Sequence, residues 1–180
     1  EHEIGVHVVS TMNSTLQKLK IFNLGFPVNT LTQEGLALLA EYTSGNLTLK
    51  RLKTIACRVI VTDMMCNGAD FRDCFDRLRN EYKINPDDAF KMVARIFRGG
   101  GFTKDYLYLA GFVKMFRFWE EGHDLLPLLV GKTSIQFFGT LEEMIDREMV
   151  SKPQYFTQSL LNPKIDQNHP VYSYILSGLK

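Results

Sequence analysis

Apolar residues recur at helical spacing along most of the 180-residue chain, whereas strand signals are few and short. The stretch "ADFRDCFDRLRNEY", for example, places Phe71, Cys74, Phe75 and Leu78 on one helical stripe. Comparable patterns predict helices at about residues 2–12, 48–65, 86–97, 102–122 and 140–150. With no internal repeat and no linker, the sequence predicts a single, mostly α-helical domain.

A further helix is predicted after the loop that contains the breakers Gly25 and Pro27. Thr30 or Thr32 can act as its N-cap, and Gly45 is expected to end it. This boundary would place Glu34 in the first turn of the helix.

The composition excludes several classes of protein. A net charge of +1 gives no electrostatic footprint for nucleic acid, and no apolar run reaches the length of a membrane span. Three cysteines, an odd number at no metal-ligand spacing, favour reduced thiols and therefore a cytoplasmic protein.

The opening segment "EHEIGVH" holds two histidines that are five residues apart, His2 and His7. On a regular helix, residues four apart lie about 40° apart around the axis, but residues five apart lie about 140° apart. A π-bulge would restore a shared face, and Gly5 makes such a distortion less costly. The spacing is therefore compatible with a metal site, but it predicts a helix defect there. The alternative is two unrelated histidines at a helix end.

A catalytic zinc site usually has three protein ligands, and the best candidate for the third is Glu34 in "TQEGLA". Gly35 follows it and leaves room for a close approach. The alternative is that Glu34 is a capping acid near the start of its helix.

"HEIGVH", followed about thirty residues later by "QEGLA", resembles a bacterial family assigned as zinc metallopeptidases, the QEGLA-motif proteins, and their eukaryotic relatives, the microtubule-associated tubulin tyrosine carboxypeptidases. The stretches "RIFRGG", "FTKDYLYLAG" and "PLLVGKTSI" are similar to later segments of this family. The resemblance extends from His2 to about Met149. It implies a zincin-like helix that carries H-E-x-x-x-H. Because the motif begins at the second residue, we expect residues 1–180 to be the C-terminal part of a catalytic domain whose N-terminal portion is missing.

The resemblance also implies roles for individual residues. His2, His7 and Glu34 would be the ligands of a Zn²⁺ ion, and Glu3 would be the general base of a zinc metallopeptidase. Two imidazoles and a carboxylate are a ligand set that zinc peptidases use. The family's activity implies a carboxypeptidase that removes a C-terminal residue, with an aromatic residue such as tyrosine as one candidate.

Substrate binding would then require donors for a C-terminal carboxylate. Arg95 and Arg98 are three apart, and Lys104 and Tyr108 are four apart, so each pair shares a helix face. We predict that the three cations bind substrate, with Arg98 and Lys104 on the carboxylate, and that Tyr108 stabilises the oxyanion. The alternative is that the arginines pair with Asp87, Asp88 or the glutamates, and that Tyr108 is a core ring with a satisfied hydroxyl.

The expected partner is the C-terminus of a peptide or protein, with no nucleic acid and no membrane involved. Tubulin would be the substrate only if this protein is a eukaryotic relative. A different class of function remains open, namely a non-catalytic helical regulatory or binding protein that holds a structural metal or none.

Overall fold

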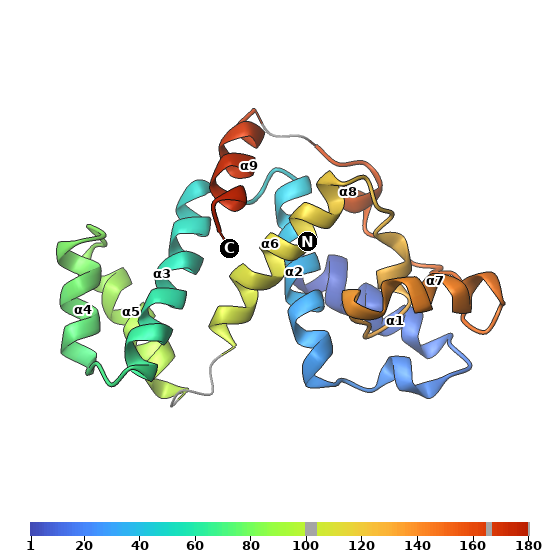
Figure 1. The fold of residues 1–180 in the computed structure, drawn as a ribbon, viewed down its shortest axis with the longest axis horizontal. Coiled ribbons are helices and arrows are strands. Elements are labelled where there is room, and N and C mark those ends of the chain that lie inside the picture. Colours follow the sequence, from blue (N-terminus) through green and yellow to red (C-terminus); the bar gives the residue numbers. More distant parts are fainter. Residues whose placement is uncertain (100–103, 165–166, 180) are drawn as a thin grey trace. The chain divides into compact units, whose positions relative to one another are not determined.

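The computed structural model describes residues 1–99, 104–164 and 167–179, and within them the only regular elements are helices (Figure 1). The prediction of a mostly α-helical protein is therefore confirmed. The expected single domain contains two compact units, one formed by Glu1–Thr48 and Ala110–Lys180, the other by Leu49–Leu109. The glycine run after residue 99, which the sequence places between two helices, lies outside the described residues.

The first unit contains most of the helices. They are η1 (His2–Val8), α1 (Val9–Thr15), η2 (Lys20–Asn23), α2 (Pro27–Thr43), η3 (Leu126–Leu129), η4 (Ile135–Phe137), α7 (Phe138–Asp146), α8 (Gln158–Leu161) and α9 (His169–Ser177). Helix α6 (Asp105–Glu120) begins in the second unit and continues into the first.

Helix α2 begins earlier than the sequence predicts. Pro27 is its first residue, and its fixed φ angle suits that position. Thr32 is not a cap but a buried residue, and its hydroxyl accepts a hydrogen bond from the Ile135 N–H at 3.0 Å. Glu34 therefore lies two turns inside the helix, so the expectation that it lies in the first turn is wrong, and so is its reading as a capping acid.

The middle of α2 is enclosed by the rest of the first unit. Every residue from Thr32 to Ala40 is buried. The backbones of α2 and α6 come close together at Gly35 and Gly111. A Cβ atom added to Gly35 would lie only 2.9 Å from the Cα of Gly111. Absent side chains thus let the two backbones meet. After Ser44 the chain turns at Gly45, with φ of 76°, and the predicted stop is confirmed.

The second unit is a group of three helices, α3 (Leu49–Cys66), α4 (Phe71–Asn80) and α5 (Pro86–Arg98), which pack on one another (Figure 1). Helix α4 begins with a reciprocal capping box between Asp70 and Asp73. The core contains Cys57, Val61, Cys74, Leu78, Ala89, Met92, Val93 and Ile96. All three cysteines are free thiols, as the sequence predicts.

Across the described ranges, every helix is too short or too polar to cross a lipid bilayer.

Candidate metal centre

The helix that carries the two histidines has the defect that their spacing predicts. η1 is a π-helix, and the Val9 N–H at its end reaches back five residues to the Ile4 carbonyl. This wider turn places His2 and His7 on one face, where their ring centroids lie 5.3 Å apart.

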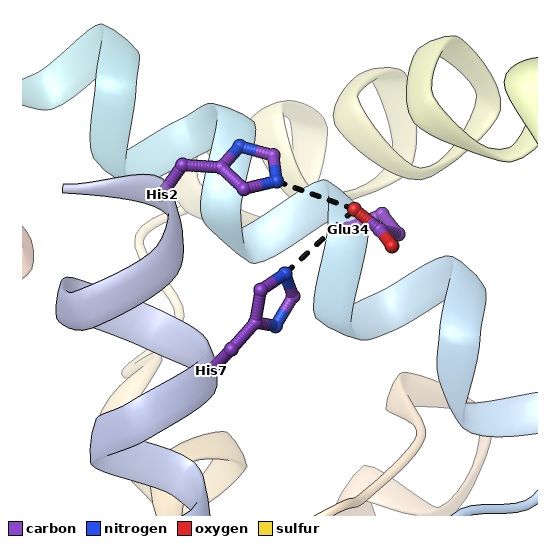
Figure 2. Close-up of side chains that lie close together, drawn as sticks. All are labelled: His2, His7 and Glu34. Atoms are coloured by element: carbon purple, nitrogen blue, oxygen red, sulfur yellow. Dashed lines mark hydrogen bonds and ion pairs between the residues drawn. The ribbon is translucent and has the colours of Figure 1, made fainter.

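Both rings turn toward the carboxylate of Glu34 on α2 (Figure 2). The same oxygen, Oε2, lies 3.3 Å from Nε2 of His2 and 3.7 Å from Nε2 of His7. One ligand atom from each side chain lies within 4.8 Å of the other two. In a tetrahedral zinc site, ligand atoms about 2 Å from the ion lie about 3.3 Å from one another, so binding would bring the most distant pair closer by up to about 1.5 Å.

The environment of Glu34 suits a cation. Its side chain is only 6% exposed, and a buried carboxylate must be compensated by positive charge or by hydrogen bonds. His7 is more open, with 29% of its side chain exposed, so the cluster is reachable from solvent. Two neutral imidazoles and a carboxylate are donors that Zn²⁺ accepts, so the residues fit a zinc ion.

A residue that the sequence analysis did not identify, Glu41, completes the cluster. Its Oε1 lies 2.8 Å from Nδ1 of His2, on the side of the ring opposite Glu34. Hydrogen bonds from the ring to Glu34 and Glu41 raise the pKa of His2 to about 9. In the metal-free protein the ring thus donates from both nitrogens, and a cation at Nε2 would take the place of one proton.

The signal for Glu41 is its position seven residues after Glu34, two helical turns along the same face of α2. A carboxylate on the far nitrogen of a metal-binding histidine fixes the ring orientation and increases its basicity. Glu41 has the geometry for this supporting role.

We expect Glu41→Ala to weaken Zn²⁺ affinity by about 10- to 100-fold without unfolding the protein. The reason is that His2 would lose the acceptor that orients its ring. Competition with a colorimetric chelator measures the affinity. Glu121→Ala is the matched control, because Glu121 is exposed and its carboxylate lies 3.5 Å from a different histidine, His123. Equal affinities for the two variants would contradict a role for Glu41 at the metal.

Glu3, the predicted general base, follows His2 on η1 and is exposed. Among the described residues it has no hydrogen-bond or ion-pair partner, so its carboxylate can accept a proton. Its role as the general base stays a prediction.

The predicted substrate-binding residues belong to the second unit, whereas the metal cluster belongs to the first. The Nζ of Lys104 lies 5.4 Å from the centre of the Tyr108 ring, so these two share a face as predicted. Arg98 is exposed at the end of α5. Arg95 donates from Nε to both carboxylate oxygens of Asp105, at 2.9 and 3.1 Å.

Asp105 is a second residue that the sequence analysis did not identify. Its side chain is 4% exposed, and Arg58 also approaches it, at 3.5 Å. The ion pair raises the pKa of Arg95, whereas burial lowers that of Arg58. Arg95 therefore pairs with an acid, as the alternative interpretation expected, but with Asp105 rather than Asp87.

A helix with H-E-x-x-x-H that meets a glutamate on a second, buried helix has the donor set of a zinc peptidase. The family model described as microtubule-associated tyrosine carboxypeptidase matches residues 1–178, so the chain belongs to that family. The resemblance to the microtubule-associated tyrosine carboxypeptidases is confirmed, and membership supports a carboxypeptidase-like enzyme. A search of curated proteins found no match, and neither did a search of solved structures.

Proposed function

We propose that this protein is a zinc-dependent carboxypeptidase. The observation that supports the proposal most directly is the convergence of His2, His7 and Glu34, which a π-helix makes possible at an otherwise unfavourable spacing. Family membership supports the carboxypeptidase class independently of this geometry.

In this proposal the three side chains hold a Zn²⁺ ion. Such an ion polarises a carbonyl oxygen and lowers the pKa of water, which makes a nucleophile available near neutral pH. Glu3 lies beside a ligand and keeps an exposed carboxylate, so it can remove the proton of the attacking water and return it to the leaving amine. Glu41 holds the His2 ring in place during these steps.

We propose that the substrate is the C-terminus of a peptide or protein, with a terminal tyrosine favoured because of the family description. A tubulin tail is the corresponding protein substrate if the protein is eukaryotic. Arg98 and Lys104 would bind the terminal carboxylate, and Tyr108 would donate to the oxyanion. Arg95, which Asp105 orients, would be a further cation for substrate binding.

Glu3→Gln is expected to lower turnover by at least about 100-fold while the protein keeps its zinc. The amide is the same size as the carboxylate but cannot accept the proton of water. The test digests a library of peptides with varied C-terminal residues, with and without chelator, and measures bound zinc in parallel. Amidated versions of the same peptides serve as a control, because a carboxypeptidase requires a free terminal carboxylate.

Two outcomes would contradict the proposal. If the wild-type protein releases no C-terminal residue from any peptide although it holds zinc, the metal is structural and the protein is a helical regulatory or binding protein. If Glu3→Gln retains full turnover, another group must be the base.

A further inference from the structure

The carbonyl oxygen of Gly5, in the middle of the π-helix η1, accepts a hydrogen bond from the hydroxyl of Thr157. The two residues are 152 positions apart in the sequence. Thr157 is 2% exposed and Gly5 is partly exposed, so the bond is partly buried. It joins the helix with the two histidines to the segment just before α8.

The position of this bond coincides with the irregular part of the helix. The Val9 N–H donates to the carbonyls of Ile4 and Val6, five and three residues back, and passes over the Gly5 carbonyl between them. The hydroxyl of Thr157, from a distant part of the chain, supplies a donor to that carbonyl and so stabilises the wide turn.

The absence of a side chain at Gly5 permits this approach. A Cβ atom there would lie 3.3 Å from the methyl carbon of Thr157 and 2.9 Å from a carboxylate oxygen of Glu1. The hydroxyl of Ser159 lies 3.2 Å from the same Glu1 carboxylate. The segment from Thr157 to Ser159 thus contacts η1 at Gly5 and the N-cap of η1 at Glu1, on either side of His2 in the sequence.

The segment is itself held in place. The carbonyl of Thr157 accepts hydrogen bonds from the N–H groups of Leu160 and Leu161 in α8, and α8 packs against α2. Just before it, the N–H groups of Gln154 and Tyr155 both donate to the buried side chain of Asn13, at 2.9 Å each. Thr157 is therefore fixed relative to α2, the helix that carries Glu34.

From these contacts we infer that Thr157 is a positioning residue for the metal cluster, because its hydroxyl keeps η1 in the π form that brings His2 and His7 together. The inference rests on the proposed function, in which these histidines hold a metal. Thr157 touches neither histidine nor the metal, and it acts only through the Gly5 carbonyl.

The test compares Thr157→Val, which replaces the hydroxyl with a methyl group, with Thr157→Ser, which keeps it. The matched control is Thr133→Val, because Thr133 is also buried and its hydroxyl donates to a backbone carbonyl, that of Leu128, at 3.0 Å. Zn²⁺ affinity is measured by chelator competition. Hydrogen exchange of the Val9 amide is measured on the metal-free proteins, which makes this readout independent of the metal.

We expect Thr157→Val to weaken Zn²⁺ binding by about 10-fold and to speed exchange of the Val9 amide by up to about 10-fold. Thr157→Ser should restore both quantities, and Thr133→Val should change neither. If Thr157→Val matches Thr133→Val in both Zn²⁺ affinity and exchange of the Val9 amide, the inference is overturned. A valine variant that melts far below the control would also overturn it, because the loss of one hydrogen bond lowers stability only modestly and Thr157 would then be an ordinary core residue.

Failure of the proposed function would look different. If the wild-type protein does not bind Zn²⁺, the metal centre is refuted, while the exchange of Val9 still decides whether Thr157 maintains the π-helix.

Discussion

Replacing Gly111 with alanine is expected to destabilise the protein by about 3 kcal/mol, at the upper end of the usual cost of overpacking. The new Cβ would clash with the carbonyl oxygen of Leu31 and lie 3.0 Å from the backbone nitrogen of Gly35. Both neighbours are backbone atoms of α2, so no side chain can rotate away and the two helices must separate. The melting temperature should fall by roughly 6–12 °C for a chain of this size.

The control for this prediction is Gly139→Ala in helix α7. A Cβ at Gly139 would meet no atom within 4 Å, so the substitution adds only the better helix propensity of alanine. It should be neutral or stabilising by up to about 1 kcal/mol. If Gly111→Ala melts as high as Gly139→Ala, then α2 and α6 do not approach as closely as the structure indicates.

The contact of the two glycines also bears on the metal cluster. Gly35 follows Glu34 directly. The contact of α2 with α6 therefore holds α2 at the position along its axis that places the Glu34 carboxylate beside the two histidines. In "QEGLA" the glutamate is a proposed metal ligand, and the glycine supplies the close packing beside it.

The sequence was sufficient to predict the defect in the first helix, because helical geometry leaves few solutions for two histidines five residues apart. It was also sufficient to single out Glu34 as the third residue of the cluster. It misplaced the start of α2, since Thr30 and Thr32 look like caps and only the packed structure shows that Pro27 begins the helix.

The sequence did not predict the three residues that support the proposed site, Glu41, Thr157 and Asp105, and the reason differs for each. Glu41 had a local signal, its two-turn spacing from Glu34, but many exposed helices carry acids at that spacing. Thr157 had none, because its bond to Gly5 spans almost the whole chain. Asp105 pairs with Arg58 and Arg95 from two other helices, and only tertiary packing brings these charges together.

Replacing Glu34 with alanine is expected to abolish tight Zn²⁺ binding, and with it peptide cleavage. Its Oε2 lies close to both His2 and His7, so the variant keeps two of the three proposed ligands and loses the negative charge. The loss of affinity should exceed the roughly 10- to 100-fold expected for Glu41→Ala, because Glu41 acts on the site through His2. Zinc measured after dialysis should fall from about one ion per chain to almost none.

Chelation of the wild-type protein separates a catalytic metal from a structural one. The helices around the cluster are joined by contacts that need no ion, including Thr157 to Gly5 and the glycine contact of α2 and α6. Chelator should therefore abolish cleavage. It should lower the melting temperature only by the amount that bound Zn²⁺ adds to the stability of the folded protein. Added Zn²⁺ should restore cleavage in the wild type and in Glu121→Ala but not in Glu34→Ala. Cleavage that survives in Glu34→Ala, or in wild-type protein stripped of metal, would show that the cluster is not the catalytic centre.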